Sequence, residues 1–310
     1  MVENYGLPYT GSKSKIAHWV IDNLPRGRVL IDAFAGGCAI THRALLSQKW
    51  QTVIANDING KYPQLFADAV RGKYRDEKRW ISREDFERLK SKDAFVACCW
   101  SSGNNLWNYM YSQGIEPYKR ALHYAIVFDD FAPMQELMPE VAQAVADALL
   151  GQRNLHDRRI TAQNVIVKTL KRLTGDNYAH SNKDAQSLKR LQSLERLESL
   201  ESLESLESLE SLRITSLSYD EIDIPDDAVV YCDPPYHASD KTLYEGTADA
   251  FDHNAFYDWC VRVSKTNPIF ISEYSIEDDR FEIVAEKQKM TCLSSVKSFN
   301  VTERLYTVKH

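Results

Sequence analysis

Two short apolar runs near the start of the chain, each followed by turn residues, predict the first strands of a parallel sheet. Residues 29–31 are continuously apolar and lead into Asp32 and a pair of glycines, after which 39–46 has the composition of a helix. A second apolar run at 52–55 leads to Asp57, at about the 20-residue interval from the glycines that a doubly wound sheet requires. The first ~75 residues are therefore expected to form half of a Rossmann-like sheet.

The pattern changes between residues 76 and 173, where charged segments of helical composition replace the apolar runs. Segments 82–89 and 139–150 are examples, and a loop rich in glycine and asparagine at 103–105 separates them. We expect an inserted, mainly helical domain here.

The strand pattern returns toward the end of the chain. Residues 228–232 form a continuous apolar run, as a strand buried on both faces does, and 268–272 and 303–308 have the composition of two further strands. The prediction is an α/β fold in which the strands of the sheet resume after the inserted helical domain.

A triplet repeat built on Leu-Glu-Ser occupies residues 188–212. Leucines at every third position would drift ~60° per triplet around an α-helix, whereas a helix of three residues per turn would align them in one stripe. We therefore predict a 3₁₀-like rod that serves as a spacer. The alternative is a product of DNA slippage that forms an α-helix or a flexible spacer, because Leu and Glu are good α-formers. The leucines in register are Leu188, Leu191, Leu194, Leu197, Leu200, Leu203, Leu206, Leu209 and Leu212.

Composition narrows the possible classes of protein. The six cysteines show no paired spacing of the kind that binds zinc, so no metal site is expected. The net charge of −6 argues against a nucleic-acid partner, because neutralising phosphates requires Lys and Arg. Five glutamates of the repeat, from Glu198 to Glu210, account for most of that charge, so a local basic face remains possible.

The strongest chemical signal follows the strand predicted at 228–232. Open α/β sheets bind ligands at the carboxyl ends of their strands, and this strand ends in Asp233, Pro234, Pro235 and Tyr236. The exocyclic amine of an aromatic base is a poor nucleophile because its lone pair is delocalised. The Asp233 carboxylate and the Pro234 carbonyl would localise that lone pair by accepting its two hydrogens, while Tyr236 stacks on the base. The two prolines would fix the backbone so that the carboxylate and the carbonyl already point toward the amine. The alternative interpretation of these four residues is an ordinary turn at the end of a strand.

The glycine segment at 32–37 indicates the kind of cofactor. It lacks the full G-x-G-x-x-G pattern, which disfavours a dinucleotide and favours a phosphate-free cofactor such as S-adenosylmethionine. Asp57 would then accept the ribose hydroxyls, although a helix or turn cap is the alternative role for this residue.

These motifs, in this order, resemble the D12-class, Dam-like family of adenine-N6-specific DNA methyltransferases, and the resemblance covers most of the chain. The matching segments are 9–13, 32–37, 56–57 and 233–236, and the loop at 103–105 with Tyr109 and Tyr111 is similar to one in phage or prophage members. The resemblance implies a Rossmann-like methyltransferase sheet at 1–76 and 213–310, a target-recognition domain at 77–180 and the repeat as a spacer at 181–212.

The resemblance also implies the roles of individual residues. Where many relatives carry an acid before an aromatic residue, this chain has Ser218 and Tyr219, so either Asp220 substitutes or that cofactor contact is weaker. Catalysis is expected from residues 233–236. Contacts to S-adenosylmethionine are expected from Tyr9, Lys13, Asp32, Phe34, Ala35, Gly36, Gly37, Asp57 and Asp233.

The partner implied by the resemblance is double-stranded DNA. Basic residues cluster in the second half of the predicted recognition domain, where they could contact phosphates; a solvated helix face is the alternative. The candidates are Arg153, Arg158, Arg159, Lys168, Lys171 and Arg172, with Gln152, Asn154, Gln163 and Asn164 as possible readers of base edges.

Two other functions stay open from the sequence. An RNA or N4-cytosine methyltransferase would use the same cofactor, and a catalytically silent DNA-binding relative would keep the fold. No apolar run approaches the ~20 residues of a membrane span and no signal peptide is evident, so a cytoplasmic location in a bacterium or a phage-infected cell is expected.

Overall fold

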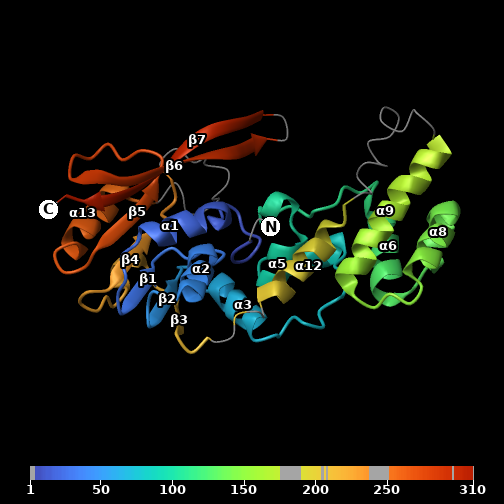
Figure 1. Ribbon diagram of the computed structural model, residues 1–310, viewed down its shortest axis with the longest axis horizontal. Coiled ribbons are helices and arrows are strands. Elements are labelled where there is room, and N and C mark those ends of the chain that lie inside the picture. Colours follow the sequence, from blue (N-terminus) through green and yellow to red (C-terminus); the bar gives the residue numbers. More distant parts are fainter. Residues whose placement is uncertain are drawn as a thin grey trace. The chain divides into compact units, whose positions relative to one another are not determined.

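The computed structural model describes residues 4–174, 190–203, 206, 209–236, 251–294 and 297–309 (Figure 1). By its internal contacts the chain divides into two compact units. Unit 1 comprises Met1–Arg71 with Leu203–His310, and unit 2 comprises Gly72–Ser202.

Unit 1 is built on a seven-stranded sheet with the strand order β3-β2-β1-β4-β5-β7-β6. The first five strands in sequence are parallel, and β7 runs antiparallel to both of its neighbours. The order reverses between β1 and β4, which is where open α/β sheets bind their ligands. The predicted α/β fold with a Rossmann-like sheet is confirmed. The strands are β1 (Val29–Asp32), β2 (Thr52–Asn56), β3 (Leu212–Thr215), β4 (Val229–Cys232), β5 (Ile269–Glu273), β6 (Phe281–Ser294) and β7 (Lys297–Val308).

Helices cover both faces of this sheet, which explains why residues 29–31 of β1 and all of β4 are apolar. Side chains of β1 alternate between the two sides: Leu30 belongs to a core with α1 and α2, whereas Ile31 belongs to a core with α13. The helices and short 3₁₀ turns of unit 1 are η1 (Ser14–Ile16), α1 (Ala17–Asn23), α2 (Ala39–Ser47), α3 (Lys61–Val70), η5 (Tyr219–Glu221) and α13 (His253–Val263).

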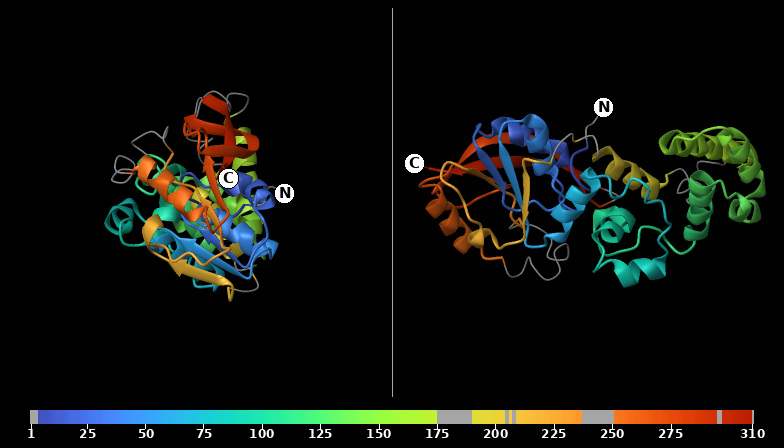
Figure 2. Two further views of the ribbon diagram at one scale, coloured as in Figure 1. Left: turned by 90° about the vertical axis from the view of Figure 1, so that its left-hand side faces the viewer. Right: turned by 90° about the horizontal axis from the view of Figure 1, so that it is seen from below.

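Unit 2 is helical over its described residues (Figure 2). Local capping sets where its first helices begin: the Ser82 side chain accepts a hydrogen bond from the Asp85 amide, and the Asp93 side chain accepts from the Phe95 and Val96 amides. Its helices are α4 (Arg83–Leu89), α5 (Ala94–Trp100), η2 (Ser102–Asn104), α6 (Glu116–Phe128), α7 (Ala132–Leu137), α8 (Pro139–Leu149), α9 (Leu155–Thr174) and α12 (Gln192–Ser202).

The triplet repeat forms an α-helix where it is best described, so the predicted 3₁₀ rod is wrong for residues 192–202. Leu and Glu favour the α form, and long 3₁₀ helices have poor hydrogen-bond geometry. Leu194, Leu197 and Leu200 are all buried, because three leucines that drift ~60° per triplet still fall within one broad stripe. That stripe packs within unit 2 against α5 and α9. The positions 188–189, 204–205 and 207–208 of the repeat lie outside the described residues.

Candidate functional site

The candidate site lies at the carboxyl edge of the sheet in unit 1. Asp32 ends β1, Asp57 follows β2 and Asp233 follows β4, so parallel pairing of these strands brings three carboxylates to one edge. The sequence predicted each of these positions, and the structure brings them together.

The turn after β1 is shaped by the two glycines and by Tyr9. Gly36 has a φ of +47°, which favours glycine, and a Cβ atom at Gly37 would lie 2.5 Å from the Tyr9 Cβ. The Ala35 amide donates to the Asn56 carbonyl at 2.8 Å, which joins the turn to the end of β2. Tyr9 therefore packs on the glycines because neither has a side chain.

Asp57 is fixed by the same turn. Its Oδ2 accepts a hydrogen bond from the Gly36 amide at 2.8 Å, and its Oδ1 accepts from the Asn59 amide at 2.8 Å. Burial raises the pKa of the Asp57 carboxyl, while the two amides oppose that rise. The preceding residue, Asn56, has a structural role: its side-chain amide donates hydrogen bonds to the backbone carbonyls of Ala33 and Leu217.

Asp32 is the most deeply buried carboxylate of the site, at 1% exposure. Its Oδ2 accepts from the Thr41 hydroxyl at 2.7 Å and from the Thr41 amide at 3.1 Å. Burial raises the pKa of Asp32 to about 7; the Thr41 hydrogen bonds oppose this, and the charges of Asp233 and Asp57 add to it. Among the described residues, its Oδ1 has no hydrogen-bond partner.

An aromatic group lies beside the turn. The rings of Phe34 and Tyr219 stack with centroids 5.8 Å apart, and Phe256 meets Phe34 edge-on at 5.7 Å. Ser218 caps the short turn that holds Tyr219. Asp220 is exposed and accepts a hydrogen bond from the Ser218 hydroxyl.

The tetrapeptide after β4 is held by residues from three other segments. Lys13 Nζ lies 2.7 Å from Asp233 Oδ1 and 4.5 Å from the centre of the Tyr236 ring. The Tyr236 hydroxyl donates to Glu303 Oε1 on β7, and Tyr274 meets the Tyr236 ring edge-on at 4.7 Å. Burial, followed by the charges of Asp233 and Glu303, raises the pKa of Tyr236 well above its ordinary value, which keeps the hydroxyl protonated as a donor. Pro234 is buried and Pro235 is half-buried.

Two residues of this cluster were missed by sequence reasoning. Glu303 and Tyr274 belong to no motif. The only signal in the sequence was a carboxylate at the start of the strand predicted at 303–308.

In unit 2, two of the six basic residues proposed for DNA are structural. Arg158 is buried, and its guanidinium donates to the carbonyls of Ile126, Ala125 and Gln152 and to the Asp129 carboxylate. It thereby caps the carboxyl end of α6. The prediction that Arg158 contacts DNA does not fit this burial.

Arg159 joins α9 to α12. Its Nε and Nη2 atoms donate to the two carboxylate oxygens of Glu198 at 2.6 and 2.9 Å, a bidentate pair. Burial alone would raise the pKa of the Glu198 carboxyl. The hydrogen bonds from Arg159 and His156 outweigh burial, so the pKa of Glu198 is lowered. Arg159 is thus occupied within unit 2. The other candidates are exposed: Arg153, Lys168, Lys171 and Arg172.

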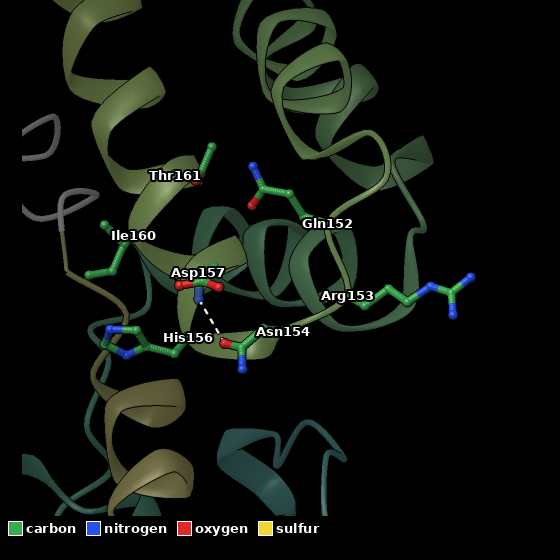
Figure 3. A pocket seen from close by; sticks show the side chains of 7 residues that line it. All are labelled: Gln152, Arg153, Asn154, His156, Asp157, Ile160 and Thr161. Atoms are coloured by element: carbon green, nitrogen blue, oxygen red, sulfur yellow. Dashed lines mark hydrogen bonds between the residues drawn. The ribbon is translucent and has the colours of Figure 1, made fainter.

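A shallow hollow of about 520 Å³ lies at the start of α9 (Figure 3). Its rim carries polar side chains, and the Asn154 side chain accepts a hydrogen bond from the Asp157 amide at 3.1 Å, as a helix cap does. Arg153 extends outward from the hollow (Figure 3). The lining residues are Gln152, Arg153, Asn154, His156, Asp157, Ile160 and Thr161.

Comparison with known proteins identifies the family. The model of the D12 class N6 adenine-specific DNA methyltransferases matches residues 9–145 and 152–304. The chain therefore belongs to this family and is an adenine-specific DNA methyltransferase. No curated protein matches the chain. None of the described helices is both long and apolar enough to cross a membrane, and no group of three or more His, Cys, Asp or Glu able to hold a metal occurs in the described part of the chain.

Proposed function

We propose that this protein transfers a methyl group from S-adenosylmethionine to N6 of an adenine in a short sequence of double-stranded DNA. The target base would leave the duplex and enter the site, with its N6 amine facing the methyl group that a bound cofactor would supply. The observation that carries the proposal is the position of Asp233 at the carboxyl end of β4, beside Lys13 and Tyr236, in a chain of this family.

The carboxyl edge of the sheet fits a cationic nucleoside cofactor. Asp32 has a buried carboxylate oxygen without a hydrogen-bond partner among the described residues, and the three carboxylates at this edge favour a positive ligand. Asp57 would bind the ribose hydroxyls, the backbone of Gly36 and Gly37 would line the methionine portion, and Phe34 would pack on the adenine. When bound, the cofactor supplies an electrophilic methyl group.

The tetrapeptide prepares the target amine. The Asp233 carboxylate and the Pro234 carbonyl would accept hydrogen bonds from the two N–H groups of the amine, so the nitrogen lone pair would be localised and able to accept the methyl group. The ring of Tyr236, held by its hydroxyl and by Tyr274, stacks on the base. These groups are in place before substrate arrives, which lowers the cost of reorganisation in the transition state.

Unit 2 supplies the recognition surface in this proposal. Arg153 projects from the loop before α9, and Lys168, Lys171 and Arg172 are exposed along that helix, where they can neutralise phosphates. Asn154 and Asn164 are exposed and can offer hydrogen bonds to base edges.

The test is incubation of the purified protein with methyl-labelled S-adenosylmethionine and unmethylated DNA, followed by digestion to nucleosides. Label in N6-methyldeoxyadenosine supports the proposal, and sequencing of the methylated DNA then gives the recognition site. Label in N4-methylcytosine, label in RNA only, or no label with any nucleic acid would contradict it. Asp233→Ala protein in the same assay controls for contaminating methyltransferases.

A further inference from the structure

Glu303 is a buried charge that no sequence motif explains. It lies on β7, and its side chain is fully buried. In the antiparallel register of β5 and β7, the next residue, Arg304, lies opposite Glu273 at the end of β5. The register therefore places Glu303 at the carboxyl edge of the sheet. A carboxylate without water costs several kcal/mol unless it is paired and hydrogen-bonded, so its partners indicate why it is there.

Both of its identified partners belong to the candidate active site. Glu303 Oε1 accepts a hydrogen bond from the Tyr236 hydroxyl and lies 3.8 Å from Lys13 Nζ. The same ammonium is 2.7 Å from Asp233. One buried cation is thus shared between the carboxylate that acts on the target amine and a second carboxylate behind it.

This sharing has a chemical consequence. A carboxylate oxygen in a close ion pair with an ammonium is a weaker acceptor for a neutral amine, because the cation attracts the same lone pairs. A second carboxylate near the ammonium reduces this competition. Its hydrogen bond to Tyr236 also limits displacement of the ring on which the base would stack.

We propose that Glu303 is a positioning residue for methyl transfer: it holds the Tyr236 ring through its hydroxyl and draws Lys13 away from Asp233 when the target amine arrives. The inference rests on the proposed function. It concerns the transfer step, since Glu303 contacts Tyr236, on which the base would stack, and lies near Lys13, which pairs with Asp233.

The test is Glu303→Gln, which keeps the shape and a hydrogen-bond acceptor but removes the charge. We expect kcat on plasmid DNA to fall about 10- to 100-fold, as small misplacements of reacting groups do, with KM for DNA and Kd for S-adenosylmethionine within about threefold of wild type. The matched control is Glu286→Gln, the same change at a half-exposed carboxylate on β6. It should leave kcat unchanged.

A double-mutant cycle with Tyr236→Phe separates positioning from general stability. If Glu303 acts partly through the tyrosine hydroxyl, Glu303→Gln costs less in kcat when that hydroxyl is absent, and the effects of the two substitutions on urea unfolding are also non-additive. Wild-type kcat in Glu303→Gln or additive effects in the cycle would overturn the inference. A fall in kcat accompanied by a similar fold-loss of cofactor affinity and by a loss of stability would also overturn it. A wild-type protein that methylates no DNA would contradict the proposed function itself, and the unfolding cycle would still test the Glu303–Tyr236 contact.

Discussion

Lys13 and Asp233 form a 2.7 Å ion pair although one precedes the first helix and the other follows the fourth strand of the sheet. Lys13 is 7% exposed and Asp233 is 18% exposed, so water screens the pair weakly. The pair joins the N-terminal segment to the tetrapeptide at 233–236. The parallel order of β1 and β4 makes this approach possible.

Asp233→Ala is expected to abolish methyl transfer, with a loss of more than ~10²-fold in kcat, because it removes a preorganised acceptor. The fold should persist, since Lys13 keeps Glu303 as a nearby counter-charge. Turnover with labelled cofactor and circular dichroism measure the two effects. Asp258→Ala, at an exposed carboxylate on α13, is the control. Turnover near the wild-type rate in Asp233→Ala would exclude the mechanism.

Binding of S-adenosylmethionine should depend on pH through Asp32. The pKa of this carboxyl is about 7 in the free protein, so it is protonated below pH 7, and a cationic ligand favours its ionised form. Binding then releases a proton, and affinity rises as pH increases from 5 to 7 and levels off above 7. Calorimetry in buffers of different ionisation enthalpy measures the proton. Asp32→Asn should flatten the dependence, and an equally steep dependence in this variant would assign it to another group.

The same carboxyl affects stability with the opposite sign. Its pKa is higher in the folded than in the unfolded state, so between pH 4 and 7 the folded protein binds the extra proton. In the absence of cofactor its contribution to stability therefore falls as pH rises through this window and is constant above it. Urea unfolding of Asp32→Asn at pH 5 and pH 8 should show a smaller difference than wild type.

Removing the exposed basic residues of unit 2 should weaken DNA binding without affecting cofactor affinity. For duplex DNA, each phosphate that the variant no longer neutralises makes the slope of log K against log salt shallower by ~0.9. Lys168→Ala with Arg172→Ala is the test pair, and Lys265→Ala with Arg262→Ala, exposed in unit 1, is the control pair. A salt slope that the test pair leaves unchanged would place the DNA surface elsewhere.

Arg159→Ala should instead destabilise unit 2, by about 2 to 3 kcal/mol, because it leaves the Glu198 carboxylate without its bidentate partner. Urea unfolding measures the loss. The double substitution Arg159→Met with Glu198→Leu should recover much of it, since an apolar pair leaves no charge unpaired. Weaker DNA binding at wild-type stability would restore Arg159 as a DNA contact.

The parts of the fold that were predictable from sequence are those with a local physical cause. Strands β1 and β4 are buried on both faces, so residues 29–31 and all of β4 are apolar, and the tetrapeptide 233–236 follows β4 directly. No residue of strand β3 is fully buried and Arg213 within it is exposed, and β6 is rich in charged residues at the edge of the sheet, so neither has a clear hydrophobic period.

The site residues that sequence reasoning missed depend on tertiary pairing. Glu303 reaches the site only because β7 turns back antiparallel beside β5. Arg158 and Arg159 resemble surface residues by composition, and their burial depends on carbonyls and carboxylates contributed by α6 and α12. A long basic side chain is ambiguous in sequence because its stem packs as readily as its head binds phosphate.

The leucines of the repeat should behave as core residues of an α-helix. Leu197 is 2% exposed in α12, so Leu197→Ala should destabilise the protein by about 2 to 5 kcal/mol through reduced burial and a cavity. Leu150→Ala, at a leucine that is 87% exposed in unit 2, should change stability by less than about 0.5 kcal/mol. Deleting Glu198 alone rotates the residues that follow it by ~100°, which turns Leu200 out of the buried stripe and removes the partner of Arg159, so it should also destabilise the protein. Wild-type unfolding in Leu197→Ala would show that the repeat acts as a spacer and not as packed core.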